Sequence, residues 1–141
     1  MSRTYRIREC RHEDCPAVLD LWRRAEAIPS QTDTLDDLQR LVDEHGGLFL
    51  VAEEAERLVG TIIAGWDGWR GNMYRLAVLP EFRRRGIARF LVAEAERRLR
   101  AKGACRITAL VVKSGEEAMA FWQAIGYDHD QRMVRYVKTL E

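Results

Sequence analysis

The stretch "PEFRRRGIARFLVAEAERRLR", residues 80–100, combines an amphipathic helix with a cluster of arginines at its start. Its apolar residues recur at i, i+3 and i+4 spacing and Gly103 follows just beyond, so the pattern predicts a helix. Arg83, Arg84 and Arg85 lie where that helix would begin. A helix N-terminus carries about half a positive charge and unpaired N–H groups, which favour anions over cations. The arginines are therefore either solvated charges or part of an anion site.

The residues around this cluster favour the anion site. "MYRLAVLP" predicts a strand that Pro80 ends, and a strand followed by a glycine-containing turn and a helix is a recurrent site for phosphate. Gly86 would allow close approach of the backbone to a diphosphate, and Ala88 keeps the next helical turn narrow. The sequence contains neither GxxxxGK[ST] nor GxGxxG, so a P-loop and a Rossmann site are not indicated.

Composition narrows the class of protein. The 141 residues are 47% hydrophobic and 32% charged, which is typical of one soluble globular domain, here expected over residues 4–141. A net charge of +1 does not favour nucleic acid, and no apolar stretch is long enough to cross a membrane, so we expect a cytoplasmic protein without either partner. Cys10, Cys15 and Cys105 form no CxxC pair, and no metal site is expected.

Hydrophobic periodicity along the chain predicts a mixed fold. The expected elements are a strand at 4–9, helices near 18–22 and 35–42, a hairpin of strands at 48–54 and 58–66, a strand at 73–80, the arginine-led helix, a strand at 105–113, a helix at 116–126 and a strand at 133–140. The N-cap of the second helix is expected within residues 32–34. The order β-α-α-β-β-β-α-β-α-β predicts an α/β (α+β) domain with a mixed, mostly antiparallel central sheet flanked by helices.

The segment "MYRLAVLPEFRRRGIARFLV" resembles motif A of the GNAT superfamily of N-acetyltransferases, which is written [RQ]-x-x-G-x-[GA] after a strand. The order of elements from about Thr4 to Leu140 is similar to that of the family, and "AMAFWQAIGY" resembles its late helix. "GWDGWRG" is similar to a loop of the bacterial branch that includes the acetyltransferase YpeA. The resemblance implies that acetyl-CoA is the co-substrate and that its pyrophosphate is the anion.

The resemblance also implies roles for single residues. Main-chain groups of the motif A strand would pair with the pantetheine arm, and the N–H of Val78 would polarise the thioester carbonyl. The implied cofactor-binding residues are Leu76, Ala77, Val78, Arg83, Arg84, Arg85, Gly86, Ile87, Ala88, Arg89, Ser114 and Trp122.

The groups for proton transfer depart from the family pattern. Trp122 stands where the family has the tyrosine that protonates the leaving thiolate, so the acid would be solvent or Tyr127. The motif A strand has Tyr74 and Arg75 where some members carry a glutamate base. Asp67 is the remaining candidate base, with the alternative that it only binds its own turn.

The acceptor side is expected, by analogy with the family, at the first two helices and the loop joining two strands. Its candidate residues, which could instead cap the core, are Trp22, Ile28, Gln31, Trp66, Trp69 and Arg70. The resemblance implies an acetyl-CoA-dependent N-acetyltransferase acting on a small-molecule amine or on a protein N-terminus or lysine. The alternative is an acyl-CoA-binding sensor of the same fold, and a homodimer through the last strand is left open.

Overall fold

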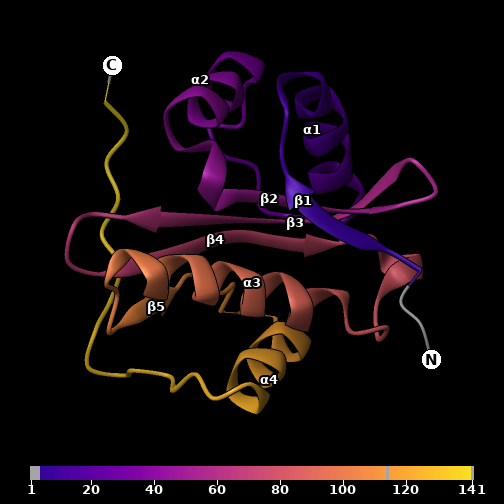
Figure 1. Ribbon diagram of the computed structural model, residues 1–141. Helices are drawn as coiled ribbons and strands as arrows, with labels where there is room; N and C mark the ends of the chain where they lie inside the picture. Colours follow the sequence, from indigo (N-terminus) through magenta and orange to yellow (C-terminus); the bar gives the residue numbers. More distant parts are fainter. Residues whose placement is uncertain (1–3, 114, 141) are drawn as a thin grey trace. The chain divides into compact units, whose positions relative to one another are not determined.

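A five-stranded sheet is the frame of the first part of the chain (Figure 1). The structure is a computed structural model that describes residues 4–113 and 115–140. The chain divides into two compact units, one ending at Ala109 and one beginning at Leu110. The strands of the first unit are β1 (Arg6–Glu9), β2 (Phe49–Glu54), β3 (Arg57–Trp66), β4 (Gly71–Val78) and β5 (Ile107–Ala109).

The sheet has the order β1-β2-β3-β4-β5, and its first four strands form an antiparallel meander. β5 runs parallel to β4 and pairs with it only from Gly71 to Met73. A parallel pair needs a crossover connection, which here contains the helix α3 (Ile87–Lys102). The predicted fold class, with a mixed and mainly antiparallel sheet, is confirmed.

Helices cover both faces of this sheet. Helices α1 (Cys15–Arg24) and α2 (Leu35–His45) pack on one face, and α3 packs on the other (Figure 1). This arrangement explains why every residue from Phe49 to Ala52 is buried, because side chains on both faces of β2 are covered. No helix in the described residues is long and apolar enough to cross a membrane.

Local sequence sets the ends of several elements as predicted. The hydroxyl of Thr34 accepts a hydrogen bond of 3.1 Å from the N–H of Asp37, which caps α2 within the expected residues. α3 begins after Gly86 and ends before Gly103, whose φ values of 84° and 111° are left-handed. The hairpin of β2 and β3 turns at residues 55–56.

The second unit contains the helix α4 (Glu116–Ala124), as predicted, but not the expected last strand. Residues 128–140 contain no helix or strand, and Met133, Val134 and Tyr136 are 70%, 78% and 93% exposed. The strand expected at 133–140 is therefore wrong. Alternating apolar residues favour a strand only where a neighbouring edge supplies the ladder, and sequence alone does not show that edge. The strand expected at 105–113 is likewise limited to Ile107–Ala109.

The carboxylate of Glu94 on α3 makes stability depend on acid pH. Hydrogen bonding to Arg97, and also to Arg98 at 2.8 Å, lowers the pKa of Glu94 from 4.5 to about 2. A lowered pKa in the folded state contributes stability above pH 4.5 that is lost as the pH falls toward 2.

We therefore expect Glu94→Gln to lower the free energy of unfolding at neutral pH, and the difference from the wild type to shrink toward zero between pH 4.5 and pH 2. Urea unfolding at a series of pH values measures this. A difference that stays constant across that range would show that the ionised carboxylate is not the cause.

Candidate functional site

The turn between β4 and α3 has a backbone shape suited to an anion. After the short 3-10 helix η3 (Pro80–Phe82), Arg84 and Gly86 both have left-handed backbones, with φ of 63° and 84°. Left-handed residues two positions apart turn successive N–H groups into one concavity. A residue other than glycine in this conformation carries strain, which is common at ligand-binding turns.

Several N–H groups of this turn make no hydrogen bond to the residues that the structure describes. Phe82 and Arg83 donate back to Leu79 and Pro80, and Phe90 donates to Gly86 at 3.1 Å. Among the described residues, the N–H groups of 84–89 between them have no hydrogen-bond acceptor. α3 is 16 residues long, so its positive N-terminus adds to these donors. These donors and the helix N-terminus are the features of the turn that suit an anion.

Two of the clustered arginines, Arg83 and Arg85, make contacts within the protein. Arg83 donates from Nε to the carbonyl of Val78 at 3.1 Å and from Nη2 to that of Ala25 at 3.3 Å. Arg85 forms an ion pair of 2.9 Å with Glu54 and lies over the ring of Phe82. Both residues are exposed, but their guanidinium groups hold the turn through these contacts.

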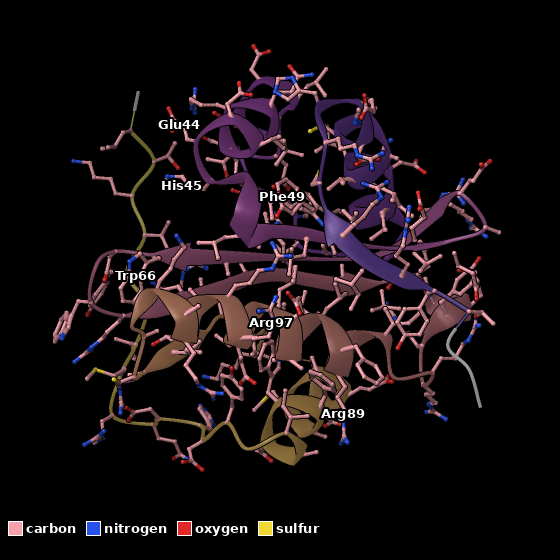
Figure 2. All side chains as sticks on the ribbon, in the orientation of Figure 1. Glu44, His45, Phe49, Trp66, Arg89 and Arg97 are labelled. Carbon is pink, nitrogen blue, oxygen red and sulfur yellow. The ribbon has the colours of Figure 1, made fainter. Side chains whose placement is uncertain are left out.

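Arg84 and Arg89 differ from these two. Both are exposed, and neither makes a hydrogen bond or ion pair within the part of the chain that the structure describes. Arg89 lies in the first turn of α3 (Figure 2). These two guanidinium groups, beside the unused N–H groups, are the ones available to an anionic ligand.

The part of β4 that leads to this turn has an open edge. From Tyr74 to Val78, β4 pairs with β3 but has no strand partner on its other side among the described residues. The N–H of Leu79 donates to the carbonyl of Val59 at 2.9 Å. Because an antiparallel ladder alternates, the groups of Ala77 then face β3, and those of Val78 point to the open edge. The N–H of Val78 therefore points away from β3 toward the open edge, whereas the N–H of Ala77 points toward β3.

Leu76 lies at a β-bulge next to this edge. β3 places one residue, Ile62, opposite Arg75 and Leu76 of β4, and Arg75 has a left-handed φ of 53°. A bulge leaves the extra residue without a regular ladder bond and bends the strand. The open edge therefore begins at a local bend in β4.

Asp67 binds its own turn, as the structural alternative for this residue predicted. Its Oδ1 accepts hydrogen bonds from the N–H groups of Arg70 at 2.6 Å and Trp69 at 2.7 Å. These bonds lower the pKa of Asp67, which makes the carboxylate a weaker base. Asp67 also lies in the turn before β4, and Val78 at the far end of β4 is about 20 Å away along the strand. This geometry does not support a role for Asp67 as general base.

The candidate acceptor residues lie in two separate places. Trp66, Trp69 and Arg70 are at the β3–β4 turn, where Arg70 lies 4.0 Å over the exposed ring of Trp69. Figure 2 shows Trp66 at that end of the sheet, near the last turn of α3.

The other three candidates are on α1 and in the segment after it. Trp22 is buried and donates from Nε1 to the hydroxyl of Thr61 at 2.9 Å, so it belongs to the core. Ile28 and Gln31 are exposed in the segment between α1 and α2. The structure therefore does not bring all six candidates together.

The second unit holds the candidate proton donor. Trp122 contacts Phe121 at 5.6 Å and Tyr127 at 4.8 Å between ring centroids, both edge-on. The N–H of Tyr127 donates to the carbonyl of Trp122 at 3.0 Å, which links the residue to the end of α4. Ser114, which was predicted to bind the cofactor, lies outside the described residues.

A pair of residues that sequence reasoning did not assign joins β4 to the segment after α1. Nη2 of Arg75 lies 2.7 Å and 2.6 Å from the two carboxylate oxygens of Asp33. The partners are 42 residues apart, so no local pattern could have indicated the pair.

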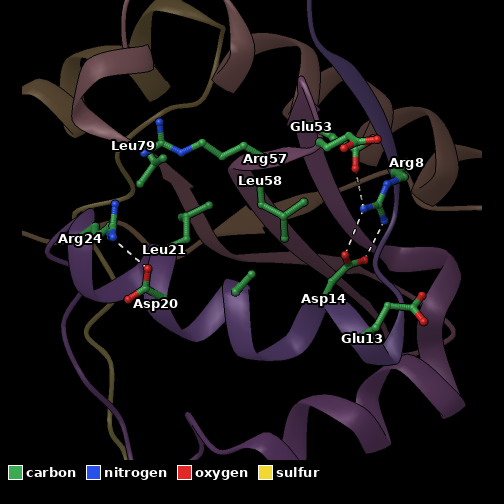
Figure 3. A pocket seen from close by; sticks show the side chains of 12 residues that line it. Arg8, Glu13, Asp14, Asp20, Leu21, Arg24, Glu53, Arg57, Leu58 and Leu79 are labelled. Carbon is green, nitrogen blue, oxygen red and sulfur yellow. Dashed lines mark hydrogen bonds and ion pairs between the residues drawn. The ribbon is translucent and has the colours of Figure 1, made fainter.

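A separate cleft of about 350 Å³ lies beside α1 and the β2–β3 hairpin (Figure 3). In it Arg8 binds both carboxylate oxygens of Asp14, at 2.7 Å and 3.0 Å, and Glu53 at 3.1 Å. Burial alone would raise the pKa of Asp14, but hydrogen bonds from Arg8 and from the N–H of Arg11 outweigh it and lower the pKa. This network connects β1, the start of α1 and β2.

The cysteines do not form a reactive site in the structure. All three are free thiols, with Cys10 and Cys15 buried and Cys105 exposed. Burial raises the pKa of the Cys10 and Cys15 thiols, so they are protonated at neutral pH. Within the described residues no group of three His, Cys, Asp or Glu side chains could hold a metal ion.

The fold is a mixed α/β domain in which a turn with unused backbone donors follows an open strand edge. The sequence profile of the acetyltransferase (GNAT) family matches residues 9–127. The chain belongs to the acetyltransferase (GNAT) family.

Solved structures with the same fold include enzymes with different acceptors. PaiA N-acetyltransferase from Thermoplasma acidophilum, in complex with coenzyme A, is 22% identical with a TM-score of 0.77, over 93% of this chain and 94% of that one. AAC(6')-Iy, in complex with a bisubstrate analogue, is 20% identical with a TM-score of 0.77, over 99% and 100%. The ribosomal-protein-S18-alanine N-acetyltransferase from Escherichia coli is 18% identical with a TM-score of 0.72, over 90% and 79%. At such identities these structures establish the fold alone.

Proposed function

We propose that this protein is an N-acetyltransferase that transfers the acetyl group of acetyl-CoA to a primary amine. The observation that carries the proposal is the β4–α3 turn, where the N–H groups of 84–89 and the side chains of Arg84 and Arg89 have no hydrogen-bond partner in the described part of the chain. A diphosphate supplies acceptors for these donors, and acetyl-CoA contains one. The complex of PaiA N-acetyltransferase with coenzyme A supports this choice of ligand.

The reaction follows from the open edge of β4. The pantetheine arm lies along that edge, and the N–H of Val78 donates to the thioester carbonyl, which gains negative charge during attack. The amine nitrogen forms a bond to the carbonyl carbon, the carbon–sulfur bond breaks, and the amine loses one proton while the thiolate gains one. No covalent enzyme intermediate is formed.

In this proposal no side chain of β4 or β5 accepts the proton of the amine. Neither β4 nor β5 contains Asp or Glu, and Asp67 is bound to its own turn. In this proposal the proton of the amine passes to solvent. The indole of Trp122 cannot donate a proton usefully, so the thiolate is protonated by solvent or by Tyr127.

The acceptor is either a small-molecule amine or a protein N-terminus or lysine. AAC(6')-Iy was solved with an acetylneamine-bearing analogue, and the Escherichia coli relative acts on ribosomal protein S18. Both kinds of acceptor thus occur on this fold. Assignment to the YpeA branch stays a prediction from the "GWDGWRG" loop.

The test is release of coenzyme A from acetyl-CoA with and without pooled amines, aminoglycosides and short peptides, followed by mass spectrometry of the acceptors. Because Cys105 is exposed, reactions that detect thiols need a blank without acetyl-CoA. Acceptor-dependent release with a gain of one acetyl group supports the proposal. Binding of acetyl-CoA without any turnover would favour the acyl-CoA sensor, for which the absence of the usual tyrosine is the supporting observation.

Replacing Trp122 with tyrosine tests whether an acid is missing. We expect Trp122→Tyr to raise kcat about tenfold, because a phenol can protonate the leaving thiolate. Trp122→Phe is the control, since it changes the ring without adding a hydroxyl. Equal kcat values for the two variants would show that protonation of the thiolate does not limit the rate.

A further inference from the structure

The segment between α1 and α2, residues 25–34, depends on side chains from elsewhere for its position. It contains no helix or strand, and Ile28 is 59% exposed. Its backbone carbonyls at Ala25 and Ile28 accept hydrogen bonds from arginines near β4, namely Arg83 and Arg75. The segment is therefore held from the strand side.

The backbone of Arg75 and the position of its guanidinium are both held by residues outside that segment. It occupies the β4 bulge with a φ of 53°, and its carbonyl accepts a hydrogen bond of 2.9 Å from the hydroxyl of Thr61. The same hydroxyl accepts from Trp22, whose ring lies 4.8 Å from the guanidinium carbon of Arg75. A buried indole thus supports the guanidinium while its hydroxyl partner holds the backbone.

The far end of Arg75 binds two points of the segment. Nη1 donates to the carbonyl of Ile28 at 2.8 Å, and Nη2 contacts both oxygens of Asp33, forming an ion pair of 2.6 Å. The side chains of Arg75 and Asp33 are only 18% and 20% exposed. An ion pair so shielded from water holds its geometry better than an exposed one. We name these contacts the Arg75–Asp33 latch.

We propose that Arg75 is a positioning residue for the amine acceptor. Through the Arg75–Asp33 latch it holds residues 25–34 beside the bulge where the open edge of β4 begins, and so presents Ile28 and Gln31 to the acceptor. The proposal rests on the proposed function, because it assigns this segment to the acceptor side of the same reaction. Arg75 itself does not touch the reacting atoms.

The test compares Arg75→Asn, Arg75→Lys and Asp33→Asn with the wild type. Asparagine tolerates a left-handed backbone, so Arg75→Asn removes the guanidinium without adding strain. Lysine keeps the charge but cannot reproduce the planar array of donors. The control is Asp43→Asn, which removes a carboxylate contact with His12 near the end of α2, where the Asp43 side chain is 63% exposed.

In hydrogen exchange, residues 25–34 should exchange about tenfold faster in Arg75→Asn and Asp33→Asn, because a charge-assisted hydrogen bond is lost. Exchange in α3 should stay unchanged.

In kinetics with an acceptor found for the wild type, KM for that amine should rise about tenfold while affinity for acetyl-CoA and kcat change less than about twofold. Arg75→Lys should recover part of both effects, and Asp43→Asn should show neither.

Unchanged exchange in residues 25–34 would overturn the latch. A parallel loss of affinity for acetyl-CoA and for the amine would overturn the positioning role, since a general loss of stability affects both. Absence of turnover by the wild type would overturn the proposed function together with the acceptor role, while hydrogen exchange still decides whether the latch exists. The failures are therefore distinguishable.

Discussion

Acetyl-CoA is expected to bind about 1,000-fold more weakly to Arg84→Glu/Arg89→Glu than to the wild type, because two charge-assisted hydrogen bonds are replaced by repulsion. Both guanidinium groups are exposed and have no internal partner among the described residues, so their loss should leave the fold intact. Isothermal titration calorimetry at fixed salt measures the change. Far-UV circular dichroism confirms folding.

The control for this prediction is Arg40→Glu/Arg132→Glu, which alters the net charge of the protein by the same amount at two ion pairs elsewhere. If affinity falls equally in the control, long-range charge accounts for the effect. A loss of less than about tenfold in the test variant would show that the backbone N–H groups hold the pyrophosphate without these side chains. The wild-type affinity should also weaken with added salt, since exposed charges are screened.

Arg8→Ala is expected to lower the free energy of unfolding by about 3–5 kcal/mol, because it leaves two carboxylates of a shielded network without their cation. Arg8 and Asp14 are each only 12% exposed, and Glu53 is 19% exposed. The network also ties β1 to β2 and to the start of α1 (Figure 3). Urea unfolding followed by circular dichroism at pH 7 measures the loss.

Arg6→Ala is the matched control, because Arg6 also lies on β1 and pairs with Glu53 at 3.0 Å but is 68% exposed. Its removal should cost no more than about 1 kcal/mol. A loss of similar size in both variants would mean that shielding from water does not set the strength of the Arg8 network. The larger effect of Arg8→Ala should also weaken at acid pH, since the pKa of Asp14 is lowered below 3.8 in the folded state and the stability from its ionised form is lost as the pH falls through that lowered pKa.

The sequence by itself determined the elements whose signals are local. Periodicity located α3, and glycines with positive φ mark its two ends at Gly86 and Gly103. The N-cap at Thr34 was within the predicted range because capping is decided by neighbouring residues. The strand, turn and helix of motif A follow the same logic, so the resemblance to the GNAT superfamily could be stated from that motif, the late helix and the order of elements.

Only the tertiary structure decided which of the candidate side chains remain available. Arg83 and Arg84 are neighbours in sequence, yet one binds the carbonyl of Val78 and the other is unpartnered among the described residues. Trp22, a candidate acceptor residue from sequence, lies in the core, and residues 133–140 contain no strand. Partners of long side chains lie tens of residues away, as Asp33 does from Arg75, and a strand needs an edge to pair with. Local patterns specify backbone conformation, whereas long-range contacts decide which donors and charges are left for a ligand.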